Sequence, residues 1–352
     1  MTDNLIGPIL LFGSGETLPA SGKAYERLNR LVGALPVISI LETPAGFQPN
    51  SEKVAAEVGD YLKKRLQNYQ PHVEIIPARH KAPPYSTDDP SLLEPMLHSN
   101  WIFMGPGSPT YAIRQLKDSL AYSCLRALHL NGSALCLASA AVLAVSRHTL
   151  PVYEIYKVGE DPFWTRGLDL LAAFGLHITF IPHWNNQDGG AGLDTSRCFM
   201  GRQRFERMLV SLPTGSTLVG IDEQTSLLIE FNTDPHCEVF GRGAVTVFKD
   251  GMENSFPSGE SFPIKVLGNF HHPREITDIP IKILQEVRDK AKAIGAAPES
   301  KPSEKVTALI RRREEARNLQ DWRKADELRA QILAEGWLVT DTPDGPALTR
   351  DR

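Results

Sequence analysis

Short, almost wholly apolar runs alternate with segments of helical periodicity through the first half of the chain. Strands are predicted at 8–12, 37–41, 73–76, 101–104 and 133–137. Helices are predicted between them at 23–35, 51–68, 110–117 and 119–130. A strand without polar residues is buried on both faces, which occurs when helices cover both sides of a parallel sheet. The pattern therefore predicts an α/β fold with a mostly parallel sheet.

The second half is predicted to complete this sheet and then to add a separate module. A helix at 167–174, a strand at 177–181 and a helix at 202–211 precede shorter strands over 217–248 and 263–268. We expect these strands to lie in the same sheet, with an antiparallel extension. A stretch rich in Pro, Ser, Ala and charge at 295–305 predicts a linker, which divides the chain into a domain at 1–294 and a small helical module at 306–352.

Composition excludes several classes of protein. The net charge is -4, so the chain has no overall positive field for polyanions or anionic lipid. The longest apolar run, 133–145, is too short to span a bilayer, and residues 1–4 carry an acid where a signal peptide has Lys or Arg, so we expect a cytoplasmic protein without membrane contact. The 4 cysteines form no CxxC pair, and His271-His272 has no Cys or acid at ligand spacing. We expect no disulfide, metal or cofactor.

Three polar residues at the ends of predicted strands suggest nucleophilic catalysis. Ser139 follows the strand 133–137 and precedes two alanines, as a tight strand-to-helix turn requires. His183 follows the strand 177–181 and would be the base, and Glu223 would accept from its other ring nitrogen. Two backbone amides, those of Ala140 and Gly107, are predicted to hold the oxyanion.

Several motifs in residues 5–270 resemble the cyanophycinase and aspartyl dipeptidase group of serine peptidases. They are 103–111 (FMGPGSPTY), 137–141 (LASAA), 167–171 (GLDLL), 181–184 (IPHW), 201–207 (GRQRFER) and 220–225 (GIDEQT). The resemblance implies the fold of class I glutamine amidotransferases, a flavodoxin-like three-layer sandwich. It also implies that Ser139 is the nucleophile, His183 the base and Glu223 the orienting acid, since the order of the three is that of the family.

Two departures from this pattern leave alternatives open. Leu137 and Ala141 replace the two glycines that flank the serine in the family, where they relieve backbone crowding. If their loss misplaces Ser139, the chain is a catalytically impaired, amidotransferase-like binding protein. Cys136 is the alternative nucleophile, because the related amidotransferases use a Cys followed by Leu-Gly and Cys136 is followed by Leu-Ala. The competing interpretation of Cys136 is a buried strand residue.

The module at 306–352 resembles a different family, the C-terminal module of cysteinyl-tRNA synthetases. The matching residues are 309–313 (LIRRR), 321–322 (DW), 325–329 (ADELR) and 341–345 (DTPDG). In that family the module contacts the anticodon of tRNA, so the resemblance implies a tRNA contact. The segment 306–352 carries 9 Lys/Arg and 9 Asp/Glu, so its net charge predicts no general affinity for phosphate. Neither synthetase catalytic signature occurs, which excludes aminoacylation.

We therefore expect a serine hydrolase of the peptidase or amidase type that acts through an acyl-enzyme. Its substrate would be a small peptide or an acidic amide, and Arg166, Arg204 and Arg207 are candidate carboxylate ligands by charge alone. The rival hypothesis is a binding protein whose module contacts tRNA or a protein partner. The chain could also assemble as a homodimer.

Overall fold

The computed structural model describes residues 5–33, 35–273, 278–295, 302–342 and 345–350. The first four residues, the centre of the predicted linker and two residues of the 341–345 motif lie outside these ranges. Contacts within the chain separate it into two compact units, Met1–Ala291 and Lys292–Arg352. Each unit is described by itself.

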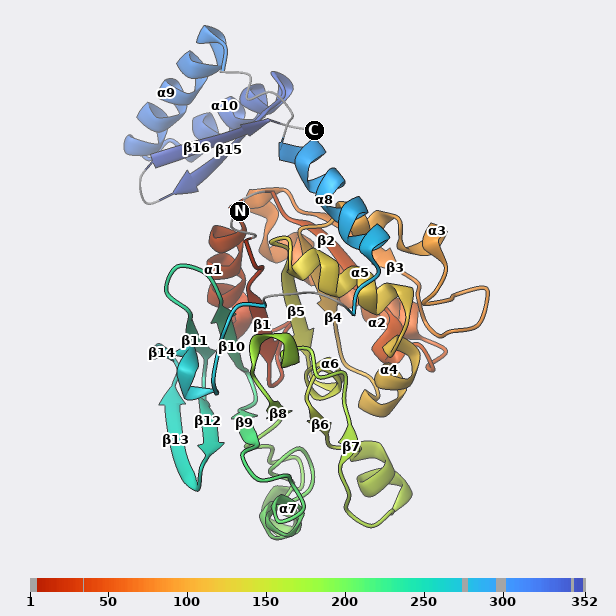
Figure 1. Cartoon of the computed structure of the whole chain (residues 1–352). Helices are drawn as coiled ribbons and strands as arrows, with labels where there is room; N and C mark the ends of the chain where they lie inside the picture. Colours follow the sequence, from red (N-terminus) through yellow and green to blue (C-terminus); the bar gives the residue numbers. More distant parts are fainter. Residues whose placement is uncertain (1–4, 34, 274–277, 296–301, 343–344, 351–352) are drawn as a thin grey trace. The chain divides into compact units, whose positions relative to one another are not determined.

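The first unit is built on an eight-stranded sheet in the order β14-β11-β10-β1-β5-β4-β2-β3 (Figure 1). Its strands are β1 (Ile9–Phe12), β2 (Val37–Leu41), β3 (His72–Ile76), β4 (Trp101–Met104), β5 (Ala134–Ala138), β10 (Thr225–Glu230), β11 (His236–Gly241) and β14 (Ser261–Pro263). The five strands from the first half of the chain are parallel to one another. The other three join antiparallel beside β1. The fold is thus the predicted α/β type, with a sheet rich in parallel pairs.

Helices cover both faces of this sheet, which explains why its central strands are apolar throughout. The α-helices of the unit are α1 (Gly22–Val32), α2 (Ser51–Arg65), α3 (Pro90–Leu93), α4 (Pro109–Leu116), α5 (Leu120–His129), α6 (Ala140–Ala144), α7 (Arg202–Leu209) and the greater part of α8 (Ile281–Gly295), which continues past Ala291. Side chains of α1 and α2 pack on one face, and those of α5 and α8 pack on the other. Successive residues of β5 alternate between the two cores, with Leu135 and Leu137 in one and Cys136 in the other.

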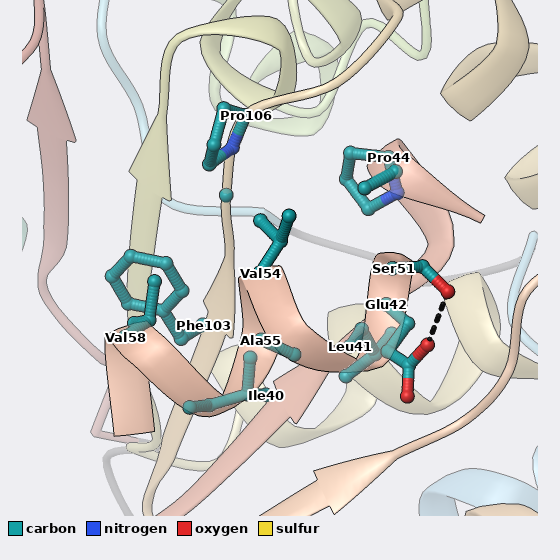
Figure 2. A pocket seen from close by; sticks show the side chains of 12 residues that line it. Ile40, Leu41, Glu42, Pro44, Ser51, Val54, Ala55, Val58, Phe103 and Pro106 are labelled. Carbon is teal, nitrogen blue, oxygen red and sulfur yellow. Dashed lines mark hydrogen bonds between the residues drawn. The ribbon is translucent and has the colours of Figure 1, made fainter. Parts of the chain in front are cut away.

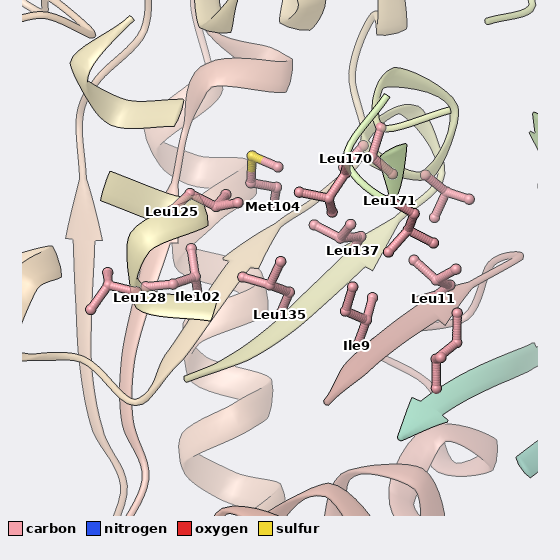
Figure 3. Close-up of a cluster of buried hydrophobic side chains, with 14 of the residues drawn as sticks. Ile9, Leu11, Ile102, Met104, Leu125, Leu128, Leu135, Leu137, Leu170 and Leu171 are labelled. Atoms are coloured by element: carbon pink, nitrogen blue, oxygen red, sulfur yellow. The ribbon is translucent and has the colours of Figure 1, made fainter. Parts of the chain in front are cut away.

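Close packing of aliphatic side chains fills the layer between β5 and α5 (Figure 3). The side chains labelled there are Ile9, Leu11, Ile102, Met104, Leu125, Leu128, Leu135, Leu137, Leu170 and Leu171. All ten are at most 4% exposed. Full burial of such a side chain stabilises a fold by about 1.5–3 kcal/mol, so this layer fixes the position of the carboxyl ends of β1 and β5.

The strand predicted at 177–181 lies outside the main sheet, and the prediction that it joins that sheet is wrong. Instead β8 (Ile178–Ile181) pairs with β9 (Thr217–Ile221) in a second, four-stranded sheet with the order β13-β12-β9-β8, completed by β12 (Ala244–Lys249) and β13 (Met252–Pro257). The reason is that β10 occupies the edge of β1, with Ile229 opposite Ile9. The chain therefore passes from the second sheet to the first through the short connection between β9 and β10.

The helix predicted at 167–174 is also absent. The chain forms β6 (His148–Thr149) with β7 (Thr165–Arg166), and only a single 3-10 turn at Ala172–Phe174. The backbone amides of Gly167, Leu168 and Leu170 donate to carbonyls between residues 144 and 147, so they are not available to a helix. Asp169 has a φ of 49°, which also interrupts helical geometry.

Beyond the end of α8, the described part of the second unit consists of two helices and a hairpin. The helices α9 (Glu304–Asn318) and α10 (Trp322–Ala334) are followed by β15 (Trp337–Thr342), which pairs antiparallel with β16 (Gly345–Arg350). Side chains of Ser303 and Asp321 cap the two helix N-termini. The small core contains Leu309, Leu328, Ile332, Trp337 and Val339. The module is helical, as the sequence predicted, and a hairpin follows its helices.

One buried side chain makes the stability of the first unit depend on pH. His129, at the end of α5, is 1% exposed and packs between Phe174 and Phe231. Neither of its ring nitrogens has a side-chain partner within the described ranges, and the Ser133 backbone opposes only part of the shift in its pKa. Burial lowers the pKa of His129 from 6.5 to about 3, because the charged imidazolium cannot be solvated there. The unfolded chain therefore binds a proton below pH 6.5 that the folded chain does not.

Replacing His129 with leucine should remove this pH dependence. When the pH is lowered from 7.5 to 5, the unfolding free energy of the parent should fall by roughly 2 kcal/mol more than that of His129→Leu. The reason is that the unfolded chain gains a proton on His129 as the pH falls through the pKa of the unfolded state, whereas the folded chain does not. Denaturant unfolding at both pH values measures the difference. His72→Leu, at an exposed position, is the matched control and should follow the parent. An identical pH dependence in His129→Leu and the parent would contradict the assignment.

Candidate active site

Ser139 lies at the junction of β5 and α6 in a strained backbone conformation. Its φ and ψ are 51° and -109°, a combination outside the regions that L-residues normally populate. Its amide donates to the carbonyl of Phe12 at the end of β1, 3.3 Å away. A sharp turn of this kind lifts the hydroxyl above the carboxyl ends of the strands, where ligands bind in such sheets.

The Ser139 hydroxyl lies beside the imidazole of His183. The distance from Ser139 Oγ to His183 Nε2 is 2.9 Å, which is a hydrogen bond. His183 follows β8, and its backbone amide donates to the carbonyl of Gly13, the residue after β1. A side chain at Gly13 would overlap the carbonyl of Asp222, so only glycine permits the close approach. The backbone thus connects the two sheets at the point where serine and histidine meet.

Glu223 contacts the other side of the imidazole. Its Oε1 accepts hydrogen bonds from His183 Nδ1 at 3.1 Å and from Asn186 Nδ2 at 2.8 Å. The hydrogen bond from His183 lowers the pKa of Glu223, and that from Asn186 adds to the effect against the opposing influence of burial. An ionised Glu223 favours the tautomer with the proton on Nδ1, which leaves Nε2 free to accept from the serine hydroxyl. Asn185 accepts from the Glu223 amide at 2.8 Å and so fixes its backbone.

The two predicted oxyanion donors border the same cavity as Ser139. The amides of Ala140, the first residue of α6, and of Gly107 donate to no protein acceptor in the part of the chain that the structure describes. Gly107 has a φ of 152°, and a side chain on it would overlap the carbonyl of Pro44. That carbonyl accepts from the amide of Ser108 at 2.9 Å and so holds the Gly107 loop in place. The arrangement leaves two amides available to a negatively charged oxygen.

The residues that replace the usual elbow glycines are absorbed into the core. Leu137 and Ala141 are both fully buried and belong to the same apolar cluster. Ser139 keeps its strained conformation between them. The side chains at 137 and 141 therefore do not relax the turn.

A cavity of about 290 Å³ opens beside Ser139 and His183. It includes side chains that the sequence reasoning missed, namely Tyr153, Tyr156, Lys157 and Phe199. None of them stands in a recognised motif or at the end of a predicted strand. The one indication of these side chains in the sequence was the number of aromatic residues in the long connections before and after β8. Glu16 was also missed; burial raises its pKa, and its interaction with His183 offsets part of that effect.

Four other predicted site residues lie elsewhere. Arg166, Arg204 and Arg207 are exposed, and none of them lines this cavity. The helical spacing of Arg204 and Arg207 on α7 directs both to solvent, because Phe205 and Met208 occupy the buried face. Cys136 is 1% exposed in the core on the α1–α2 side, and burial raises the pKa of its thiol, which opposes formation of a nucleophilic thiolate.

Two further features are structural. A cavity of about 10 Å³ lies between β2, α2 and the 105–106 turn, where Glu42 accepts from Ser51 (Figure 2). It is too small for anything larger than about one water molecule. Among the described residues, one group has the composition of a metal site, since ligand atoms of Glu230, His236 and Glu238 lie within 4.8 Å of one another. The Arg27 guanidinium pairs with both carboxylates there and offsets one of their two negative charges.

Comparison with known proteins separates the two units. Residues 301–345 match the family model of the cysteinyl-tRNA ligase anticodon binding domain. These residues of the second unit, which we call the tail, are similar to that domain. The cysteine–tRNA ligase of Rubrobacter xylanophilus is 47% identical over 45 residues, which are 13% of this chain and 10% of the ligase. That of Methanosarcina mazei is 27% identical over 112 residues, 29% of this chain and 24% of the ligase. The chain thus spans a quarter or less of the length of these relatives.

A solved structure is similar to a larger part of the chain. It is a peptidase from an acI-B1 actinobacterium, with a TM-score of 0.58 and 24% identity over 74% of this chain and 98% of that one. This likeness confirms the predicted α/β fold. Within the described ranges, none of the helices combines the length and hydrophobicity that a bilayer crossing requires.

The strain at Ser139 should be measurable as stability. Ser139→Gly relieves the unfavourable φ, whereas Ser139→Ala removes the same hydroxyl and keeps the strain. We expect Ser139→Gly to be more stable than Ser139→Ala by roughly 1 kcal/mol, after the greater freedom of glycine in the unfolded chain is allowed for. Denaturant midpoints of the two variants provide the measurement. A less stable glycine variant would mean that the turn is not strained.

Proposed function

We propose that the first unit is a serine hydrolase of the peptidase or amidase type. The observation that carries the proposal is the hydrogen-bonded series from Ser139 Oγ through His183 to Glu223, with distances of 2.9 and 3.1 Å. The amides of Ala140 and Gly107, which have no protein acceptor within the described ranges and belong to residues that line the same cavity as Ser139, support it, as does the fold shared with an actinobacterial peptidase. Residues 137 and 141 do not oppose it, because they are accommodated without relaxing the turn.

The reaction would proceed in two steps. His183 Nε2 takes the proton of Ser139 as Oγ attacks the carbonyl carbon of an amide or ester, and the amides of Ala140 and Gly107 stabilise the resulting oxyanion. The carbon–nitrogen or carbon–oxygen bond then breaks while His183 returns the proton to the leaving group. Water attacks the acyl-enzyme with the same histidine as base, which releases the acid and restores Ser139. Glu223 orients the imidazole and stabilises its charged form.

A small fluorophosphonate distinguishes this mechanism from its rivals. The parent should be labelled once, at Ser139, and the labelling should disappear in Ser139→Ala. His183→Ala should label at least about 100-fold more slowly, because general-base catalysis contributes about that much. Cys136→Ala should label at the parent rate, since its thiol is buried in the core between the sheet and the helices α1 and α2. Peptide mass spectrometry locates the label. Equal labelling of Ser139→Ala and the parent would exclude the mechanism. A folded parent that is not labelled would favour the rival hypothesis, a binding protein without hydrolase activity.

We propose a second function, contact with tRNA, for the tail. The match to an anticodon-binding domain favours it. Of the two tryptophans there, Trp337 is buried in the core and Trp322 is 59% exposed, with the Arg317 guanidinium 6.0 Å from its ring centroid. An exposed indole next to a cation is a suitable surface for stacking an unpaired base. Within the cluster Arg311–Arg313, Arg313 is buried and pairs with Asp341 through both oxygens, so it serves the fold.

Substitution of Trp322 tests this contact in the intact chain of 352 residues. Trp322→Ala should weaken binding to unfractionated tRNA by roughly tenfold, because stacking on an aromatic ring contributes about 1–3 kcal/mol per base. Leu319→Ala, at a neighbouring position that is 81% exposed, is the control and should bind like the parent. Gel shift or fluorescence anisotropy gives the dissociation constants. If the parent does not bind tRNA, or if both variants match it, the tail has another role.

A further inference from the structure

The cavity beside Ser139 is lined chiefly by apolar and aromatic side chains. It contains no carboxylate and no guanidinium among its lining residues. Leu143 and Val152 form part of its wall, and both are almost fully buried. Lys157 is the one lysine or arginine among the lining residues, and it is exposed. A carboxylate placed deep in this cavity would therefore lose its hydration without gaining a buried partner.

One wall of the cavity is a row of rings that begins at the catalytic imidazole. The Phe199 ring centroid lies 5.7 Å from that of His183, and the Tyr156 centroid lies 5.5 Å from that of Phe199. These separations are typical of aromatic pairs in protein cores. An apolar group bound near Ser139 would thus contact ring faces and edges on the same side as the base.

The backbone holds this wall in a fixed position relative to His183. Arg197, Cys198 and Phe199 all have φ between 56° and 68°, an unusual run for residues other than glycine. The amide of Cys198 donates to the carbonyl of His183 at 3.1 Å, and that of Arg197 donates to the carbonyl of Trp184 at 2.8 Å. Because the turn is bonded directly to the segment that carries the base, the backbone at Phe199 is held close to His183.

Resting on the hydrolase proposed above, we infer that this cavity binds the side chain of the residue whose carbonyl Ser139 attacks, and that it selects a large apolar or aromatic side chain. The volume of about 290 Å³ is near the lower limit for ligand pockets, so it fits a single large side chain. An acidic side chain is disfavoured, since the three arginines that charge alone suggested lie outside the cavity. The selected substrate is accordingly a short peptide or amide with an aromatic or large aliphatic acyl residue.

Three serine-reactive probes that differ only in their side chain test the selectivity of the cavity. They are aminoalkyl diphenyl phosphonates with phenylalanine, leucine and aspartate side chains, and a small fluorophosphonate is the reference. We expect the phenylalanine probe to modify Ser139 at least 10-fold faster than the aspartate probe. Phe199→Ala and Tyr156→Ala should each reduce that ratio at least 3-fold. Each rate is divided by that of the fluorophosphonate with the same variant, so a general loss of reactivity cancels.

Lys157 supplies the opposing outcome. If the aspartate probe reacts as fast as the phenylalanine probe or faster, and Lys157→Met abolishes that advantage, the cavity selects an acid through its lysine and the inference is overturned. Equal rates for all three probes in the parent would overturn it as well. Lys157→Met should leave the expected preference for phenylalanine unchanged. Absence of fluorophosphonate labelling at Ser139 would instead contradict the hydrolase itself, which keeps the two failures distinct.

Discussion

The strained backbone of Ser139 is the constraint around which the first unit is arranged. A residue with φ 51° and ψ -109° costs about 1–3 kcal/mol and persists only when its surroundings allow no relaxation. Here β5 is fixed on one side and α6 on the other by complete burial of their side chains, so the junction has no room to relax. Leu137 and Ala141 contribute to that packing, which explains how the turn is kept without the glycines that flank the serine in the family that the sequence resembles.

Backbone contacts at the end of β1 bring the remaining site residues to this serine. Gly13 accepts from the amide of His183 and donates to the carbonyl of Thr225, the first residue of β10. Trp184 donates to the carbonyl of Ile221 at the end of β9, and its ring packs where a side chain on Gly220 would lie. The histidine and the acid come from connections that follow β8 and β9 of the second sheet, whereas the serine follows a strand of the first. The site is thus assembled where the ends of two sheets meet.

The two units present different chemistry to a ligand. The cavity of the first unit is apolar and aromatic, and the one lysine or arginine among its lining residues, Lys157, is exposed. The second unit satisfies its buried arginine internally and exposes Trp322 beside Arg317. An uncharged acyl group suits the first surface, and an unpaired base suits the second. We therefore regard hydrolysis and tRNA contact as separable proposals with independent tests.

The sequence by itself determined the parallel strands of the first half, because burial on both faces leaves an apolar run that has few other interpretations. It also pointed to Ser139, His183 and Glu223, which the structure brings within hydrogen-bond distance and whose catalytic roles stay proposals. It could not determine that β8 and β9 form a second sheet, since strand pairing depends on which edge is already occupied, here by β10. Nor could it place Phe199 and Tyr156 beside the histidine or Arg204 and Arg207 in solvent. Those positions follow from helix faces and from turns bonded to distant segments, and only tertiary contacts decide them.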